Sequence, residues 1–91
     1  MGRCKKYRQC RWLDTEKIYK PIGIPLINLE IAAIAPDEFE ALRLCDLENK
    51  SQIEAAQQML ISRGTVQRLL QSGRFKLVNA ILKSQAIKIN S

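Results

Sequence analysis

The sequence predicts a mainly α fold, a four-helix helix-turn-helix domain with a short two-stranded β element. Three observations support this prediction. Helix-start signals at Ser51 and Ser62 leave room for only a tight turn between two short helices. Apolar residues recur at helical spacing from Pro36 onward, and two segments with strand character, 28–33 and 86–89, flank the helical part. The 91 residues correspond to one small domain.

Residues 1–34 are predicted to form a basic arm followed by an extended segment. Two prolines and a glycine within 21–25 favour turns there. The strand over 28–33 needs a hydrogen-bonding partner, and 86–89, within a C-terminal strand at 86–91, is the only suitable one. We expect the two to pair and to hold both ends of the chain around the helices. If they do not pair, their exposed edges invite dimerisation.

The helical core, residues 35–85, is predicted to begin with a helix from Pro36 to about Glu48. Proline suits the first position of a helix, and Asp37 and Glu38 in the first turn interact favourably with the helix dipole. Because this helix is acidic, we expect it to pack behind the next two helices, on the side away from any nucleic acid.

The next two helices form the predicted helix-turn-helix, over residues 51–72. Ser51 and Glu54 match a capping box, in which the serine oxygen and the glutamate carboxylate bind unpaired N–H groups at the helix start. Ser62 can cap the second helix through its side-chain oxygen. The segment 59–61 between the helices has the length of the short turn in a helix-turn-helix.

The outward face of the second helix is rich in arginine and glutamine. Val66, Leu69 and Leu70 fall in one apolar sector, which leaves the polar side chains on the opposite side. Arginine can donate two hydrogen bonds to guanine and glutamine can pair with adenine, so this row suits the reading of base edges. An ordinary helical hairpin with a solvated polar face is the alternative interpretation. The predicted base-reading residues are Ser62, Arg63, Gly64, Thr65, Gln67, Arg68 and Gln71.

Gly73 is predicted either to end this helix or to bend it. A fourth amphipathic helix is expected from Arg74 to Gln85. Its apolar side chains are predicted to face the core, and Arg74, Lys76 and Lys83 are predicted to point away from the core. The side chains expected to face the core are Phe75, Val78, Ile81 and Leu82.

Charge is divided into three blocks along the chain. Residues 1–20 hold seven Lys or Arg against two acidic residues, 21–60 hold two against seven, and 61–91 hold six against none. Folding this pattern gives one face suited to a phosphate backbone and another repelled by it. Solubility alone is the alternative explanation. The residues predicted to bind phosphates are Arg3, Lys5, Lys6, Arg8, Arg11, Lys50, Ser51, Arg74 and Lys76.

The composition argues against several other classes. Apolar residues make up 46% and charged residues 26%, as in globular proteins, and no apolar run approaches the roughly 18 residues of a membrane span. With no secretory signal apparent, a cytoplasmic location is expected. Three cysteines (Cys4, Cys10 and Cys45) without any histidine favour neither a disulfide set nor a metal site. No enzyme activity, cofactor or small-molecule substrate is expected, because no phosphate loop, no acid pair and no activated nucleophile is evident.

Several segments together match a known pattern: D-E-F-E-A-L-R-L-C-D at 37–46, S-Q-x-E-A-A at 51–56, M-x-x-S-R-x-T-x-x-R at 59–68, R-x-K at 74–76 and I-x-I at 87–89. Through these segments the sequence resembles a family of small prokaryotic proteins of unknown function that are predicted to bind DNA. That resemblance implies a helix-turn-helix similar to the fourth region of bacterial sigma factors and unrelated to the winged helix. It also implies transcription regulation, with Arg63, Thr65, Gln67 and Arg68 as the DNA contacts. The chain departs from such motifs at Leu60, where the turn usually holds glycine.

Two functional hypotheses follow. The leading one is sequence-specific binding of double-stranded DNA by a transcription regulator, as a homodimer on a two-fold site because one small recognition helix binds weakly. The alternative is a protein–protein interaction adaptor of the transcription machinery, which docks its partner on the acidic helix around Glu38, Glu40 and Asp46. DNA binding that weakens steeply with salt is expected only for the first.

Overall fold

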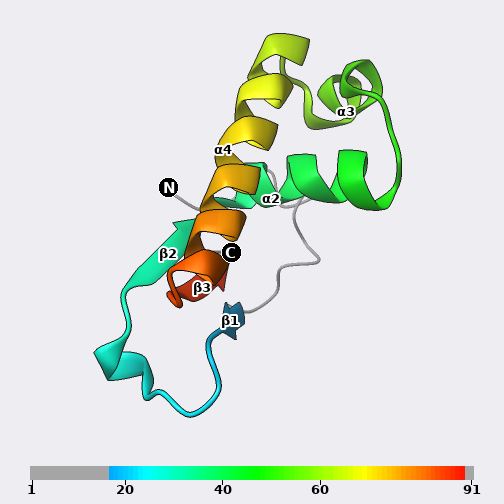
Figure 1. Ribbon diagram of the computed structural model, residues 1–91. Helices are drawn as coiled ribbons and strands as arrows, with labels where there is room; N and C mark the ends of the chain where they lie inside the picture. Colours follow the sequence, from blue (N-terminus) through cyan, green and yellow to red (C-terminus); the bar gives the residue numbers. More distant parts are fainter. Residues whose placement is uncertain (1–16, 90–91) are drawn as a thin grey trace.

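The computed structural model describes residues 17–89, and the long helix α4 (Arg63–Leu82) is its central element (Figure 1). Helix α3 (Gln52–Met59) packs against the first half of α4, α2 (Pro36–Leu42) crosses α4 near its middle, and a small sheet packs near its end. The described part is thus mainly helical, as predicted, but it contains three α-helices where the sequence predicted four.

Strand β3 (Ala86–Ile89) lies in the middle of a three-stranded sheet. It pairs in parallel with β2 (Ile31–Ile34), which confirms the predicted partnership between these two parts of the chain. Its other edge pairs antiparallel with β1 (Lys17–Tyr19), a strand that the sequence did not reveal. The prediction of a two-stranded element is therefore wrong, because the sheet has a third strand. Strand β1 provides hydrogen-bonding partners for an edge of β3 that would otherwise lack them. The strand predicted over 28–33 begins only at Ile31.

A single 3₁₀ turn, η1 (Leu26–Asn28), replaces the early part of that predicted strand. The amide of Asn28 donates to the carbonyl of Pro25 at 2.9 Å, and that of Leu29 donates to Leu26 at 3.0 Å. Pro25 has extended backbone angles at the start of this turn, so the chain turns locally before it enters the sheet.

Helix α2 begins at Pro36, as predicted, and continues into a π-helical turn, η2 (Arg43–Leu47). The Glu38 carboxylate reaches back and accepts a hydrogen bond of 2.9 Å from the Ala35 amide, which satisfies a donor at the helix start. The continuous helix expected as far as Glu48 is therefore replaced in its last part by wider π turns.

The caps and the short connection of α3 and α4 agree closely with the local signals of the sequence. Glu54 N–H donates to Ser51 Oγ at 3.0 Å and Ser51 N–H donates to the Glu54 carboxylate at 2.9 Å, which confirms the capping box. Leu60 then takes the left-handed conformation at φ 62° and ψ 43°, a conformation that glycine adopts more readily. Three residues, 60–62, join α3 to α4.

Helix α4 passes through Gly73 without interruption, so the predicted third and fourth helices are one helix. Gly73 is buried at the crossing with α2, where an added Cβ would lie 3.0 Å from Leu42 Cδ1. Glycine here therefore allows two helices to approach closely and does not end one. This continuity also decides which side chains of the second half are inside: Leu77 and Ala80 pack inward. The four residues predicted to face the core (Phe75, Val78, Ile81 and Leu82) are between 65% and 80% exposed, so that prediction was wrong.

Two hydrophobic clusters hold the elements together. The larger joins α2, η2 and α3 to the first half of α4, with Leu44, Val66 and Leu70 almost fully buried. The smaller joins the second half of α4 to the sheet. Phe39 and Leu77 contact both clusters, so the helical and sheet parts form one packed body. Within residues 17–89, no helix combines the length and the apolar character that a membrane crossing requires.

Candidate nucleic-acid interface

The first turn of α4 is fixed by a serine cap. Ser62 Oγ accepts a hydrogen bond of 3.1 Å from the Thr65 amide, as predicted for this position, and lies 2.8 Å from the Thr65 hydroxyl. Both oxygens lie at the N-terminal end of the helix, where the helix dipole is positive. This end therefore attracts negative charge and presents side chains in a defined orientation.

The outward face of the first half of α4 carries exposed amide and guanidinium groups. Gln67, Arg68 and Gln71 are exposed, and they lie on the side of α4 opposite the buried Val66 and Leu70. These side chains lie on a firmly packed helix, which is the placement that base reading in a major groove requires.

Two members of the predicted base-reading set shape the surroundings of Arg68. An Nη atom of Arg68 donates a hydrogen bond of 3.3 Å to the Thr65 hydroxyl, which orients the guanidinium along the helix. Gly64 is half-buried, and the nearest atom to a Cβ placed there is Arg68 Nη1 at 3.9 Å. The missing side chain at Gly64 leaves room beside Arg68 for the edge of a ligand.

Arg63 links the start of α4 to the start of α3. Its Nη1 donates a hydrogen bond of 3.1 Å to the side-chain carbonyl of Gln52, at the start of α3. Both groups are exposed polar groups at the N-terminal ends of their helices, where N–H groups point outward. This contact brings the two helix starts, and hence Ser51 and Ser62, to the same side of the molecule.

Acidic side chains are held on the other side of α4, mainly by internal contacts. Glu38 is 5% exposed, and its carboxylate accepts hydrogen bonds from Ser72 Oγ and from Lys76 Nζ, the latter at 2.9 Å. Burial raises the pKa of Glu38, but the hydrogen bonds from Ser72, the Ala35 amide and Lys76, with the charge of Lys76, outweigh it and hold the pKa below its ordinary value. Glu38 is thus an ionised anchor between α2 and α4.

A second set of contacts engages the acids at the end of α2. Glu40 is 4% exposed and receives two hydrogen bonds of 3.0 Å from Arg43, which also pairs with Glu48. Bidentate pairing of this kind fixes both partners in orientation. As expected, the acidic helix α2 packs behind α3 and α4, against the buried side of α4.

The predicted phosphate-binding residues within 17–89 fall into two groups. Lys50 and Ser51 lie at the start of α3, with Lys50 Nζ 4.0 Å from Glu48. Arg74 and Lys76 lie in the second half of α4 and make ion pairs, Arg74 with Asp46 at 2.6 Å and Lys76 with Glu38. Of these four residues, the structure therefore brings only Lys50 and Ser51 beside the start of α4. The other predicted phosphate contacts, Arg3, Lys5, Lys6, Arg8 and Arg11, lie outside the described residues.

Cys45 is a half-buried thiol that packs against the larger cluster. Burial and the neighbouring Asp46 raise its pKa, against a smaller opposing effect of Arg74, so the thiol stays protonated near neutral pH. Among the described residues, no three His, Cys, Asp or Glu side chains gather in a metal-binding group. Cys4 and Cys10 lie outside the described part.

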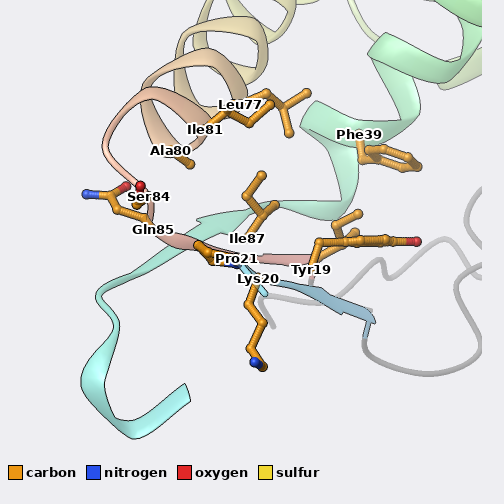
Figure 2. A pocket seen from close by; sticks show the side chains of 11 residues that line it. Tyr19, Lys20, Pro21, Phe39, Leu77, Ala80, Ile81, Ser84, Gln85 and Ile87 are labelled. Atoms are coloured by element: carbon orange, nitrogen blue, oxygen red, sulfur yellow. The ribbon is translucent and has the colours of Figure 1, made fainter. Parts of the chain in front are cut away.

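A hollow of about 600 Å³ lies away from the start of α4, between β1, the end of α4 and Phe39 (Figure 2). Its walls are mostly apolar, with Leu77 and Ala80 of α4 on one side and Ile87 of the sheet facing them, and it has a few polar groups such as Ser84 and Gln85. This hollow was not predicted from the sequence, because one of its walls is the unpredicted strand β1. It holds no acid or base pair that points to catalysis.

Comparison with known proteins gives the family. A family model described as "Protein of unknown function DUF134" matches residues 1–91. The chain belongs to this family. The resemblance that rested on the E-A-L-R-L helix and the following segments is thereby confirmed as membership of the DUF134 family, and no function is attached to it by that description.

Similar proteins cover nearly the whole chain. A UPF0251 protein of Dehalococcoides mccartyi strain 195 is 47% identical over 89 residues, which are 98% of this chain and 76% of that protein. A UPF0251 protein of Shewanella oneidensis is 46% identical over 89 residues, with 98% and 91% covered. One from Desulforudis audaxviator is 44% identical over 89 residues, and the chain spans 58% of its length. No solved structure matches this chain.

Proposed function

We propose that this member of the DUF134 family binds double-stranded DNA sequence-specifically through α3 and α4, as a transcription regulator in the cytoplasm. The observation that carries the proposal is the outward face of the first half of α4, where Gln67, Arg68 and Gln71 are exposed on a rigid helix. Groups that form two hydrogen bonds to one base edge give the strongest discrimination between bases.

The proposed docking places the first half of α4 in the major groove and α3 across the sugar-phosphate backbone. Three features support it. The capped starts of α3 and α4 lie on one side, linked by the contact between Arg63 and Gln52. The whole of α4 has no acidic residue, and Glu38 and Glu40 are buried away from its outward face. Lys50 and Ser51 then contact phosphates beside the groove, and the basic arm predicted in residues 1–16 adds to them.

The adaptor hypothesis has less support. It requires a partner to dock on the acidic helix, but Glu38 and Glu40 are at most 5% exposed and Asp46 is paired with Arg74. A docking partner would have to break these internal contacts, which leaves buried charges unpaired. The same fold without base reading remains the competing outcome of the test below.

The test begins with selection of duplexes from a random pool, followed by fluorescence anisotropy with the selected duplex and a scrambled one. We expect affinity to fall steeply as salt rises and the selected sequence to bind at least about 1,000-fold more tightly than the scrambled one. Arg68→Ala should reduce this ratio by roughly 10-fold or more, which corresponds to one lost base contact.

Lys83→Ala is the matched control, because it removes the same charge from the exposed far end of α4. This control should leave the ratio unchanged. Equal losses in the two variants would show that Arg68 acts only as a positive charge. No enriched sequence and no salt-dependent binding would overturn the proposed function.

A further inference from the structure

The outward face of α4 changes character halfway along the helix. Its first half is polar, with Arg68 and Gln71, whereas its second half presents Phe75, Val78 and Leu82, which are 68%, 65% and 80% exposed. Packing of the second half uses Leu77 and Ala80 on the opposite side. Large apolar side chains gathered on one helix face without cover are typical of an interaction surface.

The spacing along this face is that of a coiled-coil seam. Gly64, Arg68, Gln71, Phe75, Val78 and Leu82 are separated alternately by four and three residues. This alternation keeps all six on one side of a continuous helix over its whole length. The apolar stripe, defined as Phe75, Val78 and Leu82, is therefore the direct continuation of the proposed base-reading face.

We propose that a second copy of this chain covers the apolar stripe, with the two α4 helices parallel and related by a two-fold axis along them. This inference rests on the proposed function. In such a pair, each stripe residue meets its own counterpart, and the two polar halves leave the seam at the same end. They can then enter the major groove from opposite sides of one duplex, in the way that the continuous helices of bZIP dimers fork across DNA.

The charges beside the stripe are compatible with a parallel pair. When each stripe residue meets its own counterpart, Arg74 of one copy faces Asn79 of the other. These two residues hold the positions beside the seam that determine pairing in coiled coils. Arg74 is already neutralised by Asp46, so no like charges meet there. Within residues 17–89 the face is left accessible, because α2, α3 and the sheet all pack on the other sides of α4 (Figure 1).

An antiparallel pair does not fit the proposed function. It would place the two polar halves at opposite ends of the pair with their base-reading faces turned in opposite directions, so one straight duplex cannot meet both. The stripe is also short. Three side chains per copy are far fewer than the roughly 20–30 residues a side of a stable interface, so the pair forms mainly at high protein concentration or on DNA with two half-sites.

Disulfide cross-linking tests the contact and its direction. In a background with the three native cysteines replaced by alanine, Leu82→Cys alone should cross-link to itself on oxidation, at high protein concentration and more efficiently with the selected duplex. An antiparallel pair would cross-link only when the Phe75→Cys and Leu82→Cys variants are mixed. That result, or no cross-link at all, overturns the proposal.

Val78→Lys provides the functional test, with Ile27→Lys as its control. Both substitutions replace an exposed β-branched residue by lysine and add one positive charge. Ile27 is 91% exposed and lies in η1, outside the apolar stripe. Val78→Lys should lower affinity for a duplex with two half-sites on the order of 100-fold and leave affinity for one half-site unchanged. Ile27→Lys should do neither, and equal behaviour of the two variants counts against the contact.

The two proposals fail in different ways. If the wild-type protein shows no sequence-selective DNA binding, the proposed function falls, while self-cross-linking of Leu82→Cys without DNA still supports the contact. If the wild type binds DNA but Leu82→Cys does not cross-link to itself, the contact is overturned and the proposed function stands.

Discussion

Lys76 Nζ lies 2.9 Å from Glu38 Oε1, and this pair joins the second half of α4 to the start of α2. The Glu38 side chain is 6% exposed and that of Lys76 is 37% exposed, so the pair has a buried end and a solvated end. Ser72 and the Ala35 amide complete the hydrogen bonding of the carboxylate. One ionised side chain therefore fixes both the start of α2 and its crossing with α4.

Glu38→Gln should lower the free energy of unfolding by about 1–3 kcal/mol at neutral pH, because a buried charge-assisted network is lost. The folded-state pKa of Glu38 lies below its ordinary value, so its stabilisation is complete above that ordinary value. As pH falls, the unfolded chain takes up the proton first, and the stabilisation is lost progressively between about pH 5 and the folded-state pKa.

Urea unfolding across this pH range measures the effect. Wild type should lose stability on acidification, and Glu38→Gln should lose less over the same interval. Glu30→Gln is the control, since Glu30 is exposed and its change should stay within about 0.5 kcal/mol. Parallel pH profiles for wild type and Glu38→Gln would show that this carboxylate is not the titrating group.

Gly73→Ala and Gly64→Ala should change stability in opposite directions. Both glycines lie in α4, where alanine is intrinsically the better helix former by up to about 1 kcal/mol. At Gly73, however, the new methyl group meets Leu42 Cδ1 at 3.0 Å in a packed core, and overpacking of about 1–3 kcal/mol outweighs that gain. Thermal unfolding should show a lower Tm for Gly73→Ala and a higher one for Gly64→Ala. The same sign for both would contradict the close crossing.

Leu60→Gly should stabilise the protein by roughly 0.5–1 kcal/mol. Leu60 is at φ 62°, which costs a residue with a Cβ about 1–2 kcal/mol, and its side chain is 73% exposed, so little packing is lost. Part of the gain is offset by the greater freedom of glycine in the unfolded chain. Gln58→Gly, on the exposed side of α3, adds the same freedom at a helical position and should destabilise by about 1 kcal/mol. Chemical denaturation distinguishes the two.

Asp46→Asn should strengthen DNA binding at low salt if Arg74 contributes to phosphate contacts. Asp46 holds the Arg74 guanidinium by two hydrogen bonds, of 2.6 and 3.2 Å, and the substitution removes the neutralising charge. We expect a several-fold gain in affinity that disappears as salt rises, because screening reduces the effect of exposed charges. The pair is half-exposed, so stability should fall by less than about 1 kcal/mol. Anisotropy titrations at two salt concentrations measure the affinity, and an unchanged affinity at low salt would assign Arg74 a purely structural role.

The error at Gly73 explains why the buried face of the second half of α4 was predicted wrongly. If the helix is interrupted at Gly73, the orientation of the second half is predicted from its own residues alone. Phe75, Val78 and Leu82 then form its more apolar face and are predicted to be buried. Carried without interruption from Val66 and Leu70, the same helical spacing reaches Leu77 and Ala80, the residues that are packed inside. Both faces are apolar, so periodicity alone does not determine which one is buried. The exposed stripe was therefore placed on the wrong side of the helix.

The sequence by itself determined the features that depend on a few neighbouring residues. The caps at Ser51 and Ser62, the start of α2 at Pro36 and the position of the turn at Leu60 all follow from hydrogen bonds and backbone preferences within one or two turns. Only the tertiary structure decided the rest: the addition of β1 to the sheet, the continuity of α4 and the exposure of its apolar stripe. Each of these depends on contacts between segments far apart in the chain, such as Gly73 against Leu42, whose energies local sequence patterns do not record.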